Sequence, residues 1–227
     1  MIILLFLVTG QPFFIDQPTP WPLQHGQYGF LLRFGPEGSV LPYAMVGILE
    51  RFQLGLSYGA SNLIGSEDPE FYPRPEVQAK LVLIEQQFYI PQLTLGFDSQ
   101  GFGPHQGDRY RIKSKGFYLT GGEHLGLQFG WIDISLGLNY SLETVDSKTP
   151  SLFAGLMVGI GPGFGFLLDY DLGSNDPKAE GPGYFNLGLR WLINNQVLFE
   201  LSLRDLFSMH EEESFNRMVK IGYYGSF

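Results

Sequence analysis

The chain has 227 residues, of which 44% are hydrophobic and 16% are charged, and its formal net charge is −9. Because nucleic-acid binding depends on Lys and Arg side chains that neutralise phosphates, this acidic balance excludes nucleic acid as an expected partner. Cysteine is absent, which excludes a disulfide framework and a thiolate metal site. The 30 glycines oppose long helices, since glycine costs about 1 kcal/mol per helical position relative to alanine.

The first 24 residues are predicted to lie outside the folded domain. Residues 1–10 (MIILLFLVTG) form an apolar run that is too short to span a bilayer, which needs about 20 apolar residues in a helix. The run is typical of the apolar part of a signal peptide but lacks the positive start. An apolar strand or a disordered leader is the alternative. Residues 11–24 are rich in proline and predict an extended leader on the periplasmic side. Residues 25–227 form the predicted domain.

Within that domain, apolar and polar residues alternate with period two, which is typical of strands. The clearest run is 132–143, and no stretch sustains a helical period. About twelve strands are predicted, near 26–34, 40–50, 52–59, 76–86, 93–98, 109–122, 132–143, 151–161, 166–171, 184–191, 197–204 and 216–227. Many span about ten residues, the length that crosses a membrane, whereas strands of soluble proteins average about 5–6. The pattern predicts a transmembrane antiparallel up-and-down β-barrel with a polar lumen; a soluble all-β core is the alternative.

The connections between these strands alternate in length along most of the chain. Short ones are predicted near 49–51, 87–91, 123–131, 161–163 and 194–196, and longer polar ones at 60–75, 101–108, 144–150, 173–183 and 206–215. Bacterial outer-membrane barrels have short periplasmic turns and longer outer loops. With an even number of strands, this alternation predicts a bacterial outer-membrane protein with both termini in the periplasm.

The charged residues of the strands are predicted to face the lumen, because Arg or Lys on the lipid face costs about 2–4 kcal/mol at mid-depth. The candidate lumen-lining residues, which form either a pore or a plug, are Arg51, Lys80, Asp98, Arg111, Lys113, Lys115, Asp133, Asp169, Asp171, Arg190, Glu200, Arg204 and Lys220, with Arg33 and Glu143 beside them. Of these, Arg111, Lys113 and Lys115 form a basic row on one predicted strand. The row either attracts anions into a pore or is neutralised by Asp98, Asp133 and their neighbours, and we favour neutralisation.

The last strand ends in VKIGYYGSF, with Val219, Ile221, Tyr223 and Phe227 on one face. This ending resembles the C-terminal targeting strand of outer-membrane barrels. The resemblance implies that the barrel-assembly machinery reads these four residues as an assembly signal.

Candidate catalytic and metal-binding groups are few. Ser208 and His210 lack an orienting third partner, and His105 and Asp108 are better explained as a solvated turn, so no catalytic residue is assigned. Carboxylates at Glu67, Asp68 and Glu70 and at 211–213 suit Ca²⁺ but do not match the EF-hand loop, so a solvated face is favoured and no metal or cofactor is expected. The GPGFG stretch at 161–165 contains a proline and precedes no helix, which indicates a turn.

Several segments resemble uncharacterised outer-membrane barrels related to the YjbH-like family. They are LGLSYGASNLIG (54–65), PRPEVQAKLVLI (73–84), LTLGFDSQGFG (93–103), IKSKGFY (112–118) and LGLNYSLE (136–143). This resemblance implies a link with exopolysaccharide production and no established active site.

The expected function is therefore that of a non-catalytic outer-membrane barrel, acting as a narrow passive pore or envelope component. The alternative is a scaffold with a plugged lumen linked to exopolysaccharide secretion, and an outer-membrane hydrolase is a distant third. Expected partners are outer-membrane lipid, the assembly machinery, and ions, small solutes or polysaccharide.

Overall fold

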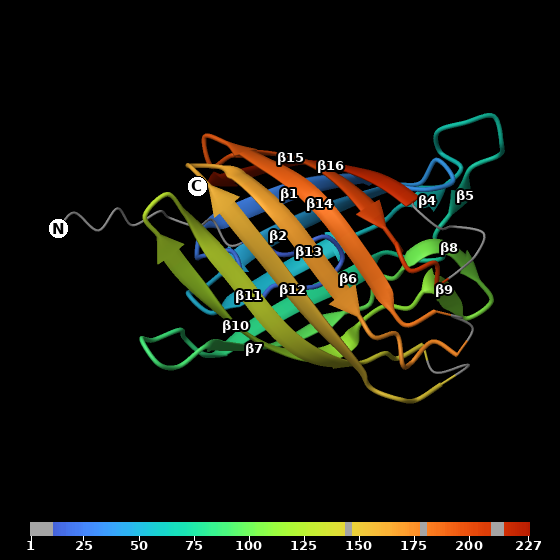
Figure 1. Ribbon diagram of the computed structural model, residues 1–227. Coiled ribbons are helices and arrows are strands. Elements are labelled where there is room, and N and C mark those ends of the chain that lie inside the picture. Colours follow the sequence, from blue (N-terminus) through green and yellow to red (C-terminus); the bar gives the residue numbers. More distant parts are fainter. Residues whose placement is uncertain (1–10, 144–146, 178–180, 210–215) are drawn as a thin grey trace.

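The computed structural model describes residues 11–143, 147–177, 181–209 and 216–227, and in these ranges the only regular elements are strands (Figure 1). The strands are β1 (Gln27–Phe34), β2 (Val40–Ile48), β3 (Phe52–Ser57), β4 (Ala60–Ser61), β5 (Glu70–Phe71), β6 (Glu76–Ile84), β7 (Gln92–Asp98), β8 (Phe102–Gln106), β9 (Arg109–Ile112), β10 (Gly116–Leu127), β11 (Gly130–Tyr140), β12 (Ser151–Ile160), β13 (Phe164–Asp171), β14 (Tyr184–Ile193), β15 (Val197–Arg204) and β16 (Asn216–Ser226). None of the described residues belongs to a helix long and apolar enough to cross a membrane.

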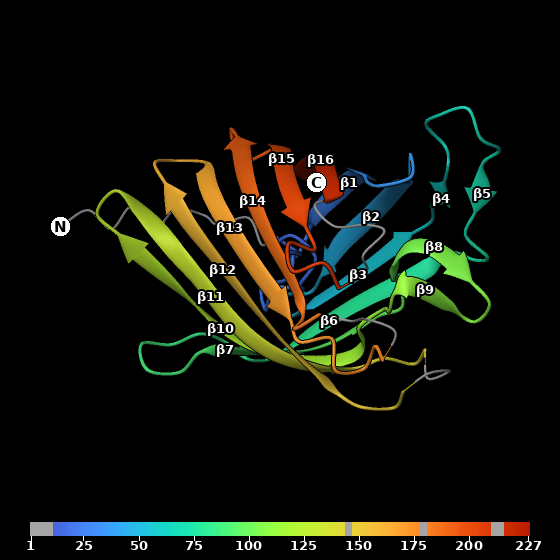
Figure 2. The same ribbon diagram turned by 45° about the vertical axis from the view of Figure 1, so that its right-hand side comes forward.

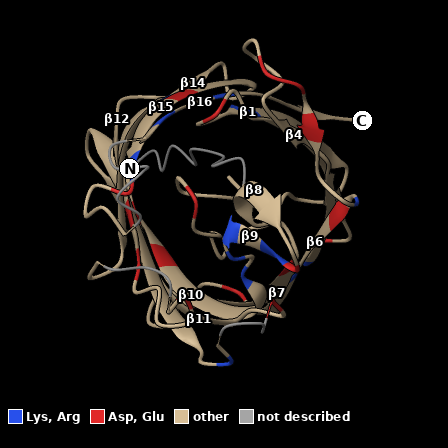
Figure 3. Ribbon diagram, turned by 90° about the vertical axis from the view of Figure 1, so that its right-hand side faces the viewer, with Lys and Arg blue, Asp and Glu red and all other residues tan. Residues whose placement is uncertain are grey.

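Twelve of these strands form a closed antiparallel barrel, which confirms the predicted fold class. Each barrel strand pairs with the next along the chain, and β1 pairs with both β2 and β16 to close the ring. The short β4–β5 pair extends from the rim beyond β3, and β8 and β9 form a separate hairpin. Figure 3 looks along the barrel axis and shows this hairpin within the outline of the wall.

The two faces of the wall differ as the alternation predicts. On β15, Leu201 and Leu203 are exposed on the outside, whereas Ser202 between them and Glu200 and Arg204 on either side are buried inside. The inner surface is polar along most strands, but it also carries apolar side chains such as Leu198. These inward apolar groups pack against the segment before β1, described below.

The connections differ in length at the two ends of the barrel (Figures 1 and 2). One end carries the short turns 49–51, 85–91, 128–129, 161–163 and 194–196, and the other carries the longer loops and the β8–β9 hairpin. The chain ends beside the short turns, where the Phe227 ring stacks on Tyr28 at 5.9 Å. The Gly161–Gly163 stretch is a turn, as predicted.

Two predicted boundaries are wrong. The strand predicted at 109–122 begins only at Gly116, and residues 109–112 belong instead to the β8–β9 hairpin. Gly103, Gly107 and Gly116 have positive φ, a conformation that favours glycine and turns the chain away from the wall at these points. The connection predicted at 123–131 is shorter in the structure, because β10 runs to Leu127 and β11 starts at Gly130.

The largest difference concerns residues 11–24, which we expected to be an extended leader. Residues 11–20 are instead buried inside the barrel, and Phe13, Phe14 and Ile15 are at most 5% exposed. Three consecutive apolar side chains gain more from burial in the lumen than from exposure to water. Residues 1–10, including the predicted signal segment, lie outside the described residues.

Candidate functional site in the barrel lumen

The lumen is occupied from the short-turn end by a small hairpin that we call the N-terminal hairpin, residues 11–20. The amide of Phe14 donates to the carbonyl of Gln17 (2.9 Å) and the amide of Thr19 to the carbonyl of Pro12 (3.1 Å). Pro12 and Pro20 break regular strand geometry around this turn. No barrel strand pairs with the hairpin in a sheet, and its contacts with the wall are made by wall side chains.

One wall carboxylate holds the tip of the hairpin. Oδ2 of Asp169, on β13, accepts hydrogen bonds from the amides of Ile15 (3.0 Å), Asp16 (2.6 Å) and Gln17 (3.0 Å). The other oxygen of Asp169 accepts from Asn186 Nδ2 (2.6 Å). Successive backbone amides form a concave site suited to an anion, and here the anion belongs to the wall.

Wall cations bind the carbonyl oxygens of the same hairpin. Lys80 Nζ donates to Pro12 O (2.6 Å) and Thr19 O (2.8 Å), and Arg190 Nη2 donates to the carbonyl oxygens of residues 13 and 14 (2.9 and 2.6 Å). Lys220 Nζ donates to the carbonyl oxygen of residue 14 (3.2 Å). The cations thus satisfy backbone acceptors that would otherwise be buried without partners.

The hairpin also contributes a charge of its own. The Asp16 carboxylate accepts hydrogen bonds from Arg33 Nη2 (2.5 Å) and from Arg204 Nε (2.6 Å), and Arg204 Nη2 lies 2.5 Å from the same carboxylate as an ion pair. Both guanidinium groups lie over the Phe102 ring, at 3.9 Å and 5.2 Å from its centroid. Phe102 belongs to β8, so the N-terminal hairpin and the β8–β9 hairpin meet at these two arginines.

A row of four charged residues, three basic and one acidic, crosses four neighbouring strands of the wall. Arg190 lies opposite Glu200, Glu200 opposite Lys220, and Lys220 opposite Arg33. Glu200 pairs with Arg190 at 2.6 Å and with Lys220 at 2.8 Å. Opposite charges facing each other across strands stabilise the sheet, and here they also place three cations against the N-terminal hairpin.

The loop end of the lumen is filled by the β8–β9 hairpin. Arg109 makes a two-bond ion pair with Asp176 (3.0 and 2.8 Å), and the Tyr184 hydroxyl donates to the same carboxylate (2.9 Å). The Glu143 carboxylate accepts from the amides of Tyr110 (3.1 Å) and Ser114 (3.2 Å), while burial raises its pKa above the ordinary value.

The predicted basic row is dispersed. Arg111 lies on β9 and pairs with Glu37 (3.1 Å), and Lys113 donates to Asn175 O (3.0 Å). Lys115 pairs with Asp171. Arg111 and Lys115 thus pair with carboxylates other than the expected Asp98 and Asp133, because the chain leaves the wall before residue 116 and takes the row away from its neighbouring strands.

Three other candidate residues lie apart from the hairpin contacts. Arg51 is not in the lumen: it lies in the turn after β2, is 54% exposed and pairs with Glu85 (2.8 Å). Asp133 accepts from His124 Nδ1 (2.6 Å) and Trp131 Nε1 (3.1 Å), and Asp98 accepts from Gln78 (3.2 Å) and the Gln100 amide (2.9 Å). The turn at 49–51 follows Ile48, where the wall strand ends, which explains the error at Arg51.

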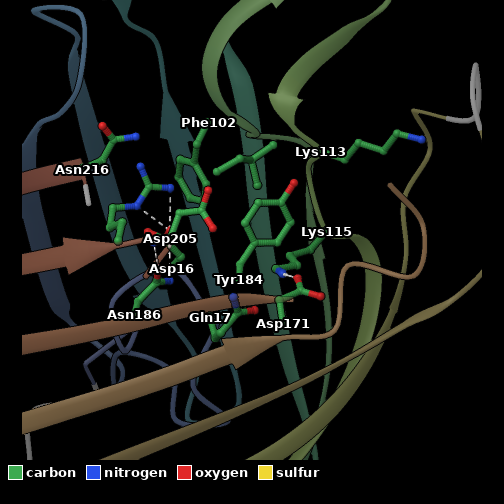
Figure 4. Close-up of a pocket in the computed structure, with 12 residues that line it drawn as sticks. Asp16, Gln17, Phe102, Lys113, Lys115, Asp171, Tyr184, Asn186, Asp205 and Asn216 are labelled. Carbon is green, nitrogen blue, oxygen red and sulfur yellow. Dashed lines mark hydrogen bonds and ion pairs between the residues drawn. The ribbon is translucent and has the colours of Figure 1, made fainter. Parts of the chain in front are cut away.

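Little space remains between the two hairpins. A cavity of about 10 Å³ lies against Asp16 and Arg204, with Lys115, Asp171 and Tyr184 on its other side (Figure 4). That volume accommodates about one water molecule. Between the two hairpins, the described residues therefore leave no room for a molecule larger than water.

Solved structures share this architecture. A KdgM porin aligns with a TM-score of 0.51 at 9% identity, over 88% of this chain and 99% of that chain. A KdgM porin in complex with disordered oligogalacturonate aligns with a TM-score of 0.51 at 10% identity over the same shares. The outer membrane protein Omp33 of Acinetobacter baumannii aligns with a TM-score of 0.50 at 7% identity, over 88% and 97%. The fold is that of an outer-membrane barrel.

These comparisons correct the family assignment made from the sequence. No family model and no curated protein matches the chain. The structural neighbours are KdgM-type porins and Omp33, not a YjbH-like family, so the exopolysaccharide link implied by that resemblance falls. The segments that carried the resemblance are strand and turn patterns, which unrelated barrels share.

The candidate metal and catalytic residues gain no partners in the part of the chain that the structure describes. No group of three His, Asp or Glu side chains gathers there as a metal site. Glu67 and Asp68 are exposed in the loop between β4 and β5, and His105 stacks edge-on against Tyr110. His210, the proposed partner of Ser208, and residues 211–213 lie outside the described ranges.

Sequence reasoning missed Asp16, the central residue of the lumen. Its signal was an acidic residue directly after the apolar run Phe13–Ile15, within a proline-bounded segment. A leader exposed to water does not need an apolar run. A segment buried in a charged lumen needs the apolar run to pack against inward apolar side chains, and it needs the acidic residue to pair with the lumen cations.

Proposed function

We propose that the chain is a non-catalytic channel of the bacterial outer membrane, with the lumen as its path and the N-terminal hairpin as its plug. The observation that carries this is the absence of strand pairing between the hairpin and the wall in the described chain. The wall closes through β1, β2 and β16 without any ladder bond to residues 11–20. Removal of the hairpin would leave a complete ring of twelve strands.

The size of the ring supports a narrow path. Barrels of about eight strands are filled by their own side chains, and porins of 16–18 strands leave a wide aqueous channel. Twelve strands lie between these limits. One structural neighbour is a porin solved with an oligogalacturonate, which supports ions, small solutes or saccharides as the class of molecule that passes.

In this proposal both termini lie in the periplasm, because short turns are periplasmic in bacterial barrels and the chain ends at the short-turn end. The plug then enters from the periplasm, and the outer apolar face contacts lipid. Val219, Ile221 and Tyr223 face outward on β16, and with Phe227 they are the proposed signal for the assembly machinery. Phe227→Ala should lower the yield of folded barrel in membranes.

The second candidate is an envelope barrel that never conducts, and the filled lumen favours it. Conductance of refolded protein in planar bilayers distinguishes the two. We expect few openings from the wild-type protein and steady conductance from a variant lacking residues 11–20, with a preference for anions. Lys80→Gln in that deletion background should weaken the preference, since Lys80 then faces the path without its carbonyl partners.

As a control, strand content and resistance to detergent must show that the deletion variant is still a folded barrel. If the folded deletion variant does not conduct, the channel proposal is wrong and the envelope role stands.

A further inference from the structure

Two lumen arginines contact a carboxylate that the plug supplies. In the described chain, Arg33 and Arg204 form ion pairs with Asp16, and Glu200 acts on Arg33 without contacting it. Both side chains are buried, at 4% and 5% exposure. By contrast, Arg190 and Lys220 share Glu200 on the wall, so they keep a partner whether or not the plug is present.

The arginine pair is also held in place without Asp16. Arg33 projects from β1 and Arg204 from β15, on either side of β16, and both stack on the Phe102 ring. Guanidinium groups match carboxylates with paired N–H donors, and sites held rigid in advance bind more tightly. Withdrawal of the plug would leave two oriented, buried guanidinium groups without the carboxylate that they contact, which is strongly unfavourable.

We propose that Arg33 and Arg204 form a binding site for the carboxylate of an acidic solute, and that Asp16 occupies it as a built-in ligand. The solute reaches the site from the loop side, where the small cavity touches Asp16 and Arg204. An acidic solute displaces Asp16 and loosens the plug. This inference rests on the proposed channel function and adds the class of solute.

Formate rescue tests the site directly. Asp16→Ala removes the carboxylate and leaves a space that formate fits, so formate should raise the urea midpoint of this variant and leave the wild type unchanged. Asp16→Asn is the matched control, because its amide removes the charge but fills the space. If Asp16→Ala fails to refold alone, its refolding yield with and without formate is the readout.

Equal rescue of Asp16→Ala and the double variant D16A/R33Q would overturn the proposal, since the arginine would then be irrelevant. No rescue of Asp16→Ala, in either stability or refolding yield, would overturn it too.

Displacement of the plug is tested separately, using the absence of native cysteine. Gln17→Cys places a thiol at the buried hairpin tip, 2% exposed in the closed state. Glucuronate should accelerate its reaction with a water-soluble maleimide about tenfold, the change expected for a tenfold shift in the open population. Glucose, which lacks the carboxylate, should not. Equal acceleration by both sugars, or none by glucuronate, contradicts displacement.

These measurements are made in detergent and need no conduction, so the two proposals fail separately. A conducting deletion variant without formate rescue leaves a channel but removes the carboxylate site. Formate rescue and glucuronate displacement in a barrel that never conducts keep the site and remove the transport role.

Discussion

The two hairpins that fill the lumen are held in different ways. The N-terminal hairpin is bound mainly through its backbone, by Asp169 at its amides and by Lys80, Arg190 and Lys220 at its carbonyl oxygens. The β8–β9 hairpin is bound through side chains, chiefly by the pair of Arg109 with Asp176. Backbone contacts fix the path of a segment with little regard to its sequence, whereas side-chain pairs tie it to particular residues.

The two modes of attachment also indicate which hairpin can leave the lumen. The N-terminal hairpin contributes a charged side chain to its own attachment, the Asp16 carboxylate, and in our proposal the carboxylate of a solute replaces it. The β8–β9 hairpin continues directly into β10 and is connected to the wall at both ends. The N-terminal hairpin is therefore the better candidate for the part that opens.

The largest effect is expected from Asp169→Ala. Three buried amides lose their acceptor, and each unsatisfied buried donor costs about 1–3 kcal/mol, so we expect a loss of at least about 3 kcal/mol and release of the N-terminal hairpin. Urea unfolding and protease cleavage within residues 11–20 measure the two results. Asp169→Asn retains an acceptor oxygen and should lose less. Wild-type resistance to protease in Asp169→Ala would contradict the backbone anchor.

Asp176→Ala should act at the other end of the lumen. It leaves the Arg109 guanidinium buried without the carboxylate that it contacts twice, and hydrogen bonds to charged groups contribute about 1.5–3 kcal/mol. We expect a loss of about 2–3 kcal/mol with protease cleavage in β8–β9 and not in residues 11–20. Cleavage of both hairpins together would show that they are not independent.

Gly155→Ala should disturb the packing of the wall against the plug. A Cβ at Gly155 would lie 2.2 Å from Phe14 Cδ2, so the Phe14 ring or the hairpin must shift. Overpacking of this kind costs about 1–3 kcal/mol. Gly121→Ala is the matched control, since this strand glycine faces outward and its nearest neighbour is at 3.6 Å. Hydrogen exchange of the 14–17 amides should rise in the first variant alone.

Arg51→Gln is expected to have the smallest effect. The Arg51–Glu85 pair is more than half exposed, and surface ion pairs contribute about 0–1 kcal/mol. Stability, conductance and both protease patterns should stay at wild-type values. A change in conductance would show that Arg51 lines the conducting path and would contradict its placement outside the lumen.

Prediction from sequence was good for the wall and poor for its contents. The alternation of Leu201 and Leu203 with Glu200 and Arg204 is visible along the chain, because the side-chain period of a strand is two. The departure of Arg111 from the wall was not visible, since its pattern alternates like the strand that follows it. The separate pairing of β8 with β9, and the positive φ at Gly103, Gly107 and Gly116, distinguish the two in the structure.

By itself, the sequence determined a twelve-stranded wall with an apolar outside, a charged inside, and long and short connections at opposite ends. These features depend on neighbours one or two residues apart. Only the tertiary structure decided what fills the lumen. Asp16 and Arg204 are 188 positions apart and Pro12 and Lys80 are 68 apart, and such pairs meet only once the barrel has closed around the hairpin.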